Sequence, residues 1–504
     1  MTLLENNKRI AKNTLYLYIR MFLIMGVTLY TSRVILQSLG VEDFGIYNIV
    51  AGIVVLFSFL NNAMAISSQR FLSFALGEKD DKDVKKIFSM SMTSHIAIAL
   101  IVFLVAETLG LWMLWEMNIP ADRIIAARWT YQFAVFTCIV QIVRVPYNAS
   151  IIAYEKMSFY AWISIIEVLL KLVIVYLLIA YKGDKLILYS FLLFFIACLI
   201  NFLYKIYCNK NFQVTKYYFH WDPILLKKIL SFSGWSLFGS LANVSASQGI
   251  NMIINLFCGV VANATVGISN QVASAVSQFL CSVQTAFNPQ LVKSYATGDN
   301  EYFMNLIFKS SKFSYYLMIT LSLPVIINCD IFLNVWLGSA PEYSTEFSQL
   351  MIVFLLIDAI SGPLWIAVQA TGRIKKYQIL MAVLILLNLP LSYICLRCGY
   401  SPVYVFVIRV AINFITLGSR IYYLKLLIKL PIYRFFKEVI NPIILVTFVS
   451  IPLSLYIDSF FYGEYIKLIC SSICIALIIL CIIIVFGLTR SEKKDLYSFV
   501  LRKF

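Results

Sequence analysis

The sequence predicts an all-α polytopic membrane protein with about 14 transmembrane helices, and three observations support this prediction. First, 61% of the 504 residues are hydrophobic and only 13% are charged, whereas a soluble domain carries about 25% charged residues. Second, apolar segments long enough to cross the ~30 Å hydrocarbon core recur along the whole chain. Third, loops rich in lysine and arginine alternate along the chain with loops that contain few of these residues. The composition therefore excludes an ordinary soluble enzyme.

The predicted helices follow one another with short connections. We place them at 13–36, 44–66, 87–111, 124–143, 158–181, 186–204, 231–257, 263–288, 313–329, 347–370, 378–396, 402–419, 439–457 and 465–487. Lys8, Arg9 and Lys12 precede the first of them. That first apolar segment exceeds the roughly 7–15 residues of a signal-peptide core, so we expect it to be retained as a helix.

The basic residues predict the orientation. With the N-terminus inside, the inner segments hold 31 of the 41 lysine and arginine residues, the outer loops hold five, and five lie inside helices. This alternation is the positive-inside pattern and predicts that both termini are cytoplasmic. The net charge of +16 is thereby explained by topology, and we expect no nucleic-acid partner.

The chain lacks the signatures of common enzymes and metal sites. We find no GxxxxGK[ST], HExxH or GxSxG motif, and the outer loops are too short for a catalytic domain. The 11 cysteines are scattered, mostly in apolar runs, and there are only two histidines, His95 and His220. We therefore predict no enzymatic activity, no metal site and no cofactor other than a possible coupling ion, H⁺ or Na⁺.

Two internal matches predict a repeat. Gln69–Gly77 aligns with Gln290–Gly298 at an offset of 221, and Pro146–Tyr160 aligns with Pro363–Tyr377 at an offset of 217. Both units fall at predicted cytoplasmic loops, so the two halves have the same orientation, as in parallel repeats. We predict a six-helix bundle over 1–210, a second over 211–430, and two further helices with a cytoplasmic tail over 431–504.

The first predicted hairpin carries a recognisable pattern, Arg33-x5-Leu39-Gly40-x3-Phe44-Gly45-x-Tyr47. It resembles the first hairpin of Wzx-type polysaccharide flippases, which share a superfamily with lipid II flippases and multidrug and toxin extrusion (MATE) transporters. The resemblance implies a bacterial cytoplasmic (inner) membrane protein that flips polyprenyl-pyrophosphate-linked oligosaccharides for O-antigen, lipopolysaccharide or capsule assembly. It also implies contacts with membrane lipids, and we expect the protein to function as a monomer.

Basic residues inside helices are candidates for binding the pyrophosphate. A charge in a membrane helix costs at least ~2.5 kcal/mol on insertion scales, so it defaults to a functional role. We select Arg20, Arg128, Lys171 and Arg409, with Arg409 heading a stripe that continues through Asn413 and Thr416. Snorkelling to the interface is the alternative for Arg20 and Arg128.

Polar and acidic residues complete the predicted site. Asn243 and Asn270 belong to polar stripes on two neighbouring helices, which suit either helix packing or a wet cavity. Glu107, Glu167, Asp358 and His95 are candidates for ion coupling. Glu167 and Lys171 stand four residues apart and are predicted to pair.

The intramembrane charges distinguish the functional alternatives. A MATE-like cation-coupled multidrug exporter needs acidic residues for its cationic substrates, but five basic residues and three acidic ones lie in the predicted helices. A membrane-bound glycan polymerase or ligase commonly carries a large outer loop, which this chain lacks. A lipid II flippase stays open, and fine sequence resemblance favours an oligosaccharide flippase.

Overall fold

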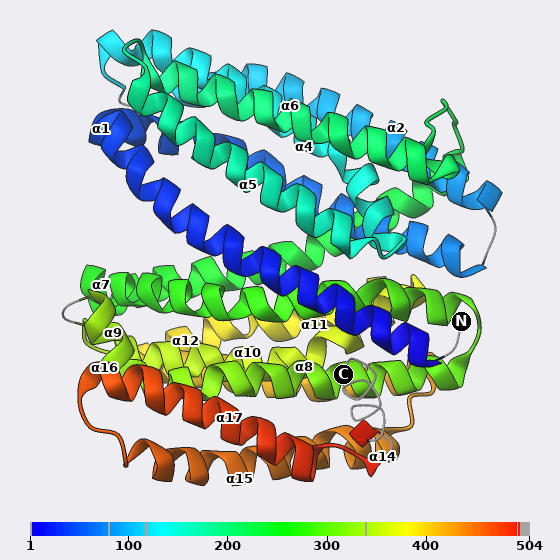
Figure 1. Ribbon diagram of the computed structural model, residues 1–504, viewed down its shortest axis with the longest axis vertical. Coiled ribbons are helices and arrows are strands. Elements are labelled where there is room, and N and C mark those ends of the chain that lie inside the picture. The colour runs from blue at the N-terminus through cyan, green and yellow to red at the C-terminus, as the bar shows by residue number, and fades with distance from the viewer. Residues whose placement is uncertain (1–2, 79–80, 116–118, 338–339, 491, 494–504) are drawn as a thin grey trace, which may run out of the picture. The chain divides into compact units, whose positions relative to one another are not determined.

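The computed structural model describes residues 3–78, 81–115, 119–337, 340–490 and 492–493, and these ranges form helices and no strands (Figure 1). Ten helices of this described part are long and apolar enough to cross a membrane. The all-α polytopic membrane fold predicted from the sequence is thus confirmed. The chain packs as an N-terminal unit, Lys12–Leu237, and a C-terminal unit that starts at Phe238 and also includes the beginning of the chain, up to Ala11.

The N-terminal unit follows the predicted order of helices. Its elements are α1 (Leu3–Glu78), α2 (Asp81–Val105), the π-helical turn η1 (Ala106–Gly110), α3 (Leu111–Trp115), η2 (Ala121–Arg123), α4 (Ile124–Ala153), α5 (Met157–Ala180), α6 (Lys185–Asn211) and η3 (Gln213–Thr215). The predicted loop between 67 and 86 is largely helical, and its residues 79–80 lie outside the described part of the chain. Helices therefore continue beyond their apolar segments.

Gly40 divides α1 between the two helices predicted at 13–36 and 44–66. Its φ of 82° and ψ of 168° are not helical, and a positive φ of this size is readily adopted only by glycine. Beyond the break, Asp43 accepts hydrogen bonds from Arg123 at 2.8 and 2.6 Å, and Arg123 also reaches Asp184 at 2.9 Å. This bidentate arrangement ties the break in α1 to the beginnings of α4 and α6.

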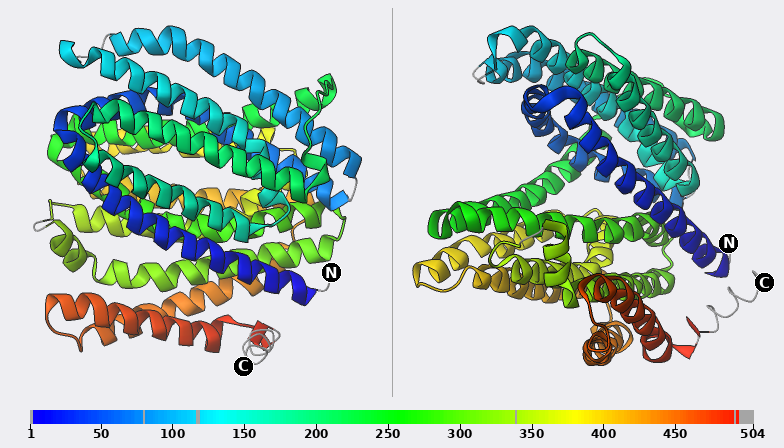
Figure 2. Two further views of the ribbon diagram at one scale, coloured as in Figure 1. Left: turned by 45° about the horizontal axis from the view of Figure 1, so that its top comes forward. Right: turned by 60° about the vertical axis from the view of Figure 1, so that its left-hand side comes forward.

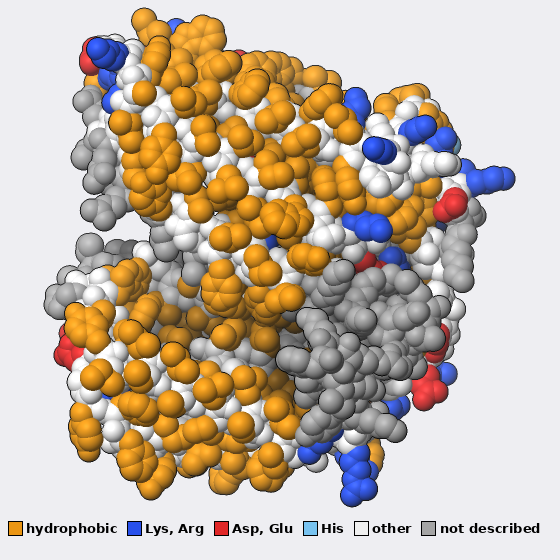
Figure 3. All heavy atoms as spheres, in the orientation of Figure 1, with side chains coloured by type: hydrophobic (Ala, Val, Ile, Leu, Met, Phe, Trp, Pro, Cys, Tyr) orange, Lys and Arg blue, Asp and Glu red, His pale blue; other side chains and the backbone are white. Residues whose placement is uncertain are grey.

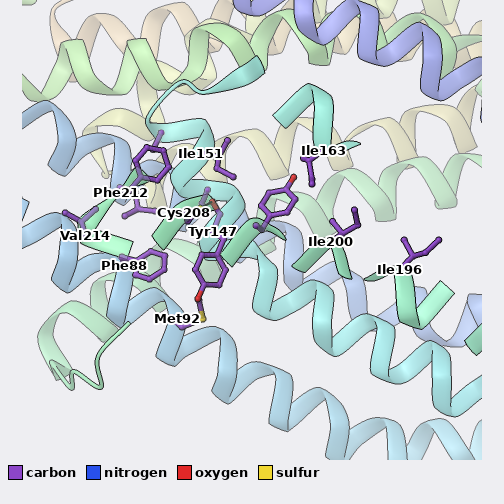
Figure 4. Packing of buried hydrophobic residues seen from close by; sticks show 14 of the residues in the cluster. Phe88, Met92, Tyr147, Ile151, Ile163, Ile196, Ile200, Cys208, Phe212 and Val214 are labelled. Atoms are coloured by element: carbon purple, nitrogen blue, oxygen red, sulfur yellow. Dashed lines mark hydrogen bonds between the residues drawn. The ribbon is translucent and has the colours of Figure 1, made fainter. Parts of the chain in front are cut away.

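The core of the N-terminal unit is formed by α2, α4, α5 and α6. Phe88, Tyr147, Ile151 and Ile200 are buried in it, and Figure 4 shows their side chains converging from different helices. At one end of the core, Phe212 stacks on Tyr154 with ring centroids 4.1 Å apart. The core therefore fixes the positions of α4, α5 and α6, which carry the charged residues described below.

The C-terminal unit begins inside the long helix α7 (Pro223–Ala296). It continues with α8 (Asn300–Ile327), α9 (Cys329–Leu337), α10 (Ser344–Thr371), α11 (Lys375–Leu386), α12 (Asn388–Arg397), α13 (Val403–Ile428), α14 (Ile432–Phe435), η4 (Phe436–Ile440), α15 (Asn441–Asp458), α16 (Glu464–Ile466), η5 (Lys467–Ser471), α17 (Ser472–Ile482) and η6 (Ile483–Gly487). The helices predicted at 231–257 and 263–288 are assigned as the single element α7, and α9 was not predicted.

Buried aromatic and aliphatic side chains hold α7, α10 and α13 together. Phe347 and Phe406 are buried with ring centroids 4.3 Å apart, and Ile250 and Ile254 of α7 join the same cluster. Hydrophobic side chains also cover the outer flanks of the helices (Figure 3), as expected for a surface that faces lipid. The domain boundaries predicted at residues 210 and 430 stay predictions, as does the parallel repeat.

A buried ion pair fixes the end of the last helix. Lys312 of α8 and Glu492 lie 2.7 Å apart, and their side chains are only 3% and 7% exposed. Glu492 also accepts hydrogen bonds from the backbone and hydroxyl of Thr489, at 2.8 and 3.0 Å. In Figures 1 and 2, α15 and α17 run side by side. The ion pair therefore joins the end of this helical hairpin to α8.

Candidate functional site

Arg144, Glu167 and Lys171 of the N-terminal unit form ion pairs, and Arg20 lies beside Tyr160, on the helix that carries Glu167. We call these four charged residues the N-terminal cation cluster. Glu167 accepts from Arg144 at 3.3 Å and from Lys171 at 2.9 Å. Arg144 and Glu167 are 21% and 23% exposed, so solvent screens them only partly. Because the four side chains are three cations and one carboxylate, the cluster carries a net charge of +2.

Tyrosine rings connect Arg20 to this cluster. The Arg20 guanidinium lies 4.6 Å from the ring centroid of Tyr160, and that of Arg144 lies 5.5 Å from the ring of Tyr204. Both arginines act electrostatically on Tyr204. Arg20 Nε is buried and finds no hydrogen-bond partner among the described residues. The arrangement thus leaves a buried donor and a surplus of positive charge, which suits an anionic ligand.

Three charged residues of the C-terminal unit form a second group, the C-terminal cation cluster: Asp358, Arg409 and Arg420. Asp358 on α10 interacts electrostatically with both arginines of α13. Within the described ranges, no ion pair of 4.0 Å or less joins them. The guanidinium of Arg409 lies 4.8 Å from the ring centroid of Phe354, and Arg420 donates to the Ser361 carbonyl at 3.1 Å. The net charge of this cluster is +1.

One face of α13 carries the arginines of the second cluster. Asn413 donates to the carbonyl of Phe354 at 3.0 Å, and Thr416 donates to the backbone carbonyl of Asn413 at 2.8 Å. The predicted stripe from Arg409 therefore faces α10, and Arg420 extends it by one more turn in the same phase. Arg420 Nε is buried without a hydrogen-bond partner among the described residues.

The other predicted ligand residues lie apart from these clusters. Arg128 is exposed, with its guanidinium 4.7 Å from the ring centroid of Trp115. The Asn243 side chain is exposed and donates to the carbonyl of Gly239, one turn earlier in α7, at 2.9 Å. Asn270 is half-buried in the same helix. The structure therefore places Lys171 on Glu167 and Arg20 beside Tyr160, both partners on α5, and places these three residues elsewhere.

Glu107 and His95 occupy different environments in the N-terminal unit. Glu107 lies in the π-helical turn η1, and one carboxylate oxygen accepts from Gln132 at 3.2 Å while the other is buried without a partner in the described ranges. His95 is fully buried, with Nδ1 2.7 Å from the Ser91 carbonyl. Because a carbonyl only accepts hydrogen bonds, Nδ1 carries the proton and Nε2 is left buried and unpaired.

Arg144 and Arg420 are not among the predicted site residues, because the predicted topology places both in loops. In the structure they lie inside α4 and α13. Two signals in the sequence point to them. Arg420 stands 11 residues after Arg409, on the same helical face, and the residues after Arg144 stay largely apolar up to Ala153. The predicted loops that begin at residues 144 and 420 therefore begin too early, because α4 and α13 continue past these positions.

The described residues contain no group of three or more histidine, cysteine, aspartate or glutamate side chains that could hold a metal ion. All 11 cysteines are free, including Cys395 and Cys398, which stand three residues apart. The two cation clusters are our candidates for binding a ligand, and their net positive charges favour an anion.

Two family models match the chain. The model of the family described as "Polysaccharide biosynthesis protein" matches residues 10–295, more than half of the 504 residues. The chain belongs to this family. A second family model, MatE, matches residues 227–394. The resemblance seen in the first hairpin is thereby confirmed: the chain is a transporter of the superfamily that holds polysaccharide flippases and MATE proteins.

Solved structures show the same fold at low sequence identity. A MATE protein in the bent conformation superposes with a TM-score of 0.71 at 13% identity, over 84% of this chain and 96% of the other. An outward-facing multidrug resistance MATE transporter gives 0.71 at 12% identity, over 83% and 96%. A transporter from Pyrococcus furiosus, noted for the reverse polarity of its binding pocket, gives 0.67 at 13% identity, with the same coverage of 83% and 96%. No curated protein matches the chain significantly.

Proposed function

We propose that this polysaccharide-family transporter flips polyprenyl-pyrophosphate-linked oligosaccharides across the bacterial cytoplasmic membrane for surface polysaccharide assembly. The observation that carries the proposal is the N-terminal cation cluster, where Arg144 and Lys171 share the Glu167 carboxylate, and Arg20 Nε has no hydrogen-bond partner among the described residues. Arginine binds phosphate through directional, charge-assisted hydrogen bonds. A pyrophosphate headgroup matches both the sign and the donors of the cluster.

The membrane potential supplies a driving force for this substrate. Moving negative charge outward across a membrane that is negative inside releases about 2.3 kcal/mol per charge per 100 mV. The family is one of transporters, and we propose that transport needs no ATP. Glu107, Glu167, Asp358 and His95 remain our candidates for coupling to H⁺ or Na⁺.

The orientation and assembly are part of the same proposal. The basic inner loops favour cytoplasmic termini, and a single chain already contains both cation clusters, which favours function as a monomer. The exposed amide of Asn243 and the half-buried Asn270 suit the hydroxyl groups of a glycan, because amides both donate and accept hydrogen bonds.

The test is export of lipid-linked glycan in cells, with membrane protein levels matched. Arg20→Ala and Arg409→Ala should each reduce export, and Arg409→Lys should as well, because lysine replaces a bidentate arginine poorly. Arg397→Ala is the matched control, since Arg397 is exposed at the end of α12. Normal export by both alanine variants would refute the role of the clusters. Dependence on Asp358 or Glu107 alone would favour a cation exporter.

A further inference from the structure

The segment that connects α6 to α7 is firmly attached at its beginning. Val214 and Thr215 are buried, as is Phe212, which packs on Tyr154 and Tyr207. The following residues leave this anchor and become exposed. Residues 216–228, which comprise the rest of the connection and the first residues of α7, therefore form a short surface segment that starts at this anchor, and we call it the linker segment.

Large apolar side chains of the linker segment project outward. Phe219 is 72% exposed, Trp221 58% and Ile224 70%, although they follow the end of the membrane-spanning helix α6 at Asn211. Such a cluster of exposed apolar side chains marks an interaction surface. Tryptophan and tyrosine are enriched where a protein crosses from lipid to water, so the composition suits the boundary of a membrane.

Contacts with α2 place the linker segment at that boundary. The hydroxyl of Tyr217 lies 3.3 Å from the hydroxyl of Thr93, and the Lys85 ammonium lies 5.1 Å from the ring centroid of Tyr218. Both partners belong to the first half of a candidate membrane span that begins at Asp81. The segment therefore runs beside the turns through which α2 enters the membrane.

The charges of the linker segment are predominantly basic. Lys216, Lys227 and Lys228 are exposed. The acidic residue of the segment, Asp222, is engaged in capping α7, where it accepts from the backbone of Ile224 at 2.9 Å and Leu225 at 3.0 Å. Figure 3 shows lysine and arginine side chains among hydrophobic ones at this right-hand end of the N-terminal unit. This mixture complements an anionic lipid surface.

We propose that the linker segment binds anionic phospholipid headgroups, with Phe219 and Trp221 inserted at the acyl boundary and the three lysines at the phosphates. In the orientation predicted above, these lipids belong to the cytoplasmic leaflet. Because Asp222 caps α7 and Ser67 donates to the carbonyl of Ile229 at 3.4 Å, lipid binding holds the start of the helix that leads into the C-terminal unit. The inference requires only a membrane location and not the proposed substrate.

The experiment uses the full chain with the photoreactive residue benzoylphenylalanine in place of Phe219 or, separately, Trp221. The protein is reconstituted into vesicles of phosphatidylcholine alone or mixed with phosphatidylglycerol, irradiated, and analysed for adducts by mass spectrometry. We expect phospholipid adducts at both positions, with phosphatidylglycerol over-represented relative to its share of the vesicle. Benzoylphenylalanine in place of Glu301, an exposed residue at the start of α8, is the control and should not show this preference.

Removing the charges separates headgroup binding from mere proximity to lipid. Each of Lys216→Gln, Lys227→Gln and Lys228→Gln should lower the preference for phosphatidylglycerol by roughly fivefold. Adducts without headgroup preference, or a preference that survives all three substitutions, would overturn the proposal. Irradiation is also repeated in native membranes. Adducts to a protein in place of lipid would there overturn the proposal as well, because a protein partner would then occupy the segment. These exposed substitutions leave the buried anchor unchanged.

Discussion

The two cation clusters stabilise charged side chains inside membrane helices through different contacts. In the N-terminal cluster, Glu167 pairs directly with Arg144 and Lys171 at 3.3 and 2.9 Å. In the C-terminal cluster, the guanidinium of Arg409 packs against an aromatic ring, and Arg420 donates to a backbone carbonyl. Direct ion pairing therefore does not cancel the net charge of a cluster. The cluster with the closer ion pairs also has the larger net positive charge, +2 against +1.

The largest effect should come from removing that surplus. The double variant Arg20→Ala/Arg144→Ala leaves a neutral Glu167–Lys171 pair and removes two arginines, each of which would donate a charge-assisted hydrogen bond worth about 1.5–3 kcal/mol to the proposed pyrophosphate. Export of lipid-linked glycan should fall by about a hundredfold or more. Arg420→Ala neutralises the C-terminal cluster by losing one such bond and should cost about tenfold. A larger loss for Arg420→Ala, with membrane levels matched, would reverse the comparison.

The buried pair of Lys312 and Glu492 gives a structural reference for both clusters. Lys312→Ala would leave a carboxylate that is 7% exposed without its cation, so the free energy of unfolding should fall by about 3 kcal/mol. Replacing both residues by methionine should restore most of the loss, because the desolvated charges disappear together. Thermal unfolding in detergent measures both variants. If the double methionine variant does not regain the lost free energy of unfolding, the pair stabilises the protein through more than its charges.

The same pair should make stability depend on pH. Burial opposes ionisation of Glu492, but the hydrogen bond and charge of Lys312 hold the pKa of this carboxyl below its usual range. A lowered folded-state pKa contributes stability that is complete above the unfolded value of about 4.3 and is lost as the pH falls through the folded value. Unfolding temperatures measured across this acidic range should fall less steeply in the double methionine variant. Equal slopes would contradict the assignment.

A smaller effect should distinguish the acidic residues of the two clusters. Glu167→Ala removes the direct partner of two cations that are 21% and 44% exposed, and we expect a stability loss of about 1–2 kcal/mol after screening by solvent. Asp358→Asn should cost less, since no arginine of its cluster lies within 4.0 Å of it in the described residues. Unfolding of both variants under identical conditions is the measurement. A greater loss for Asp358→Asn would contradict the difference in pairing.

The smallest effect is expected at Arg128, which belongs to neither cluster. Its side chain is exposed and lies over Trp115, and a cation–π contact at an exposed site is worth about 0.5–1 kcal/mol. Arg128→Ala should reduce export by less than about fivefold. A loss as large as that of the Arg20/Arg144 double variant would show that a third anion-binding region is missing from the comparison.

Local patterns in the sequence were enough to predict the helices and part of the site. The break at Gly40 follows from a glycine at the end of an apolar run, and the pairing of Glu167 with Lys171 follows from their helical spacing. The involvement of Arg144 could not follow in this way, because its partner Glu167 comes from another helix. The contact between Arg20 and Tyr160 joins residues 140 positions apart and depends on how α1 and α5 pack. Packing over such distances leaves no periodic signal in one sequence.

The account rests on transport of an anionic lipid-linked glycan, and the purified protein in vesicles tests this most directly. The measurement is movement of a polyprenyl-pyrophosphate oligosaccharide between leaflets under an imposed membrane potential, for the wild type, the Arg20→Ala/Arg409→Ala variant and the Arg397→Ala control. The account predicts that movement accelerates when the starting side is negative and that the arginine double variant loses it while the control keeps it. Transport of a cationic compound in place of the glycan, or normal movement in the double variant, would contradict it.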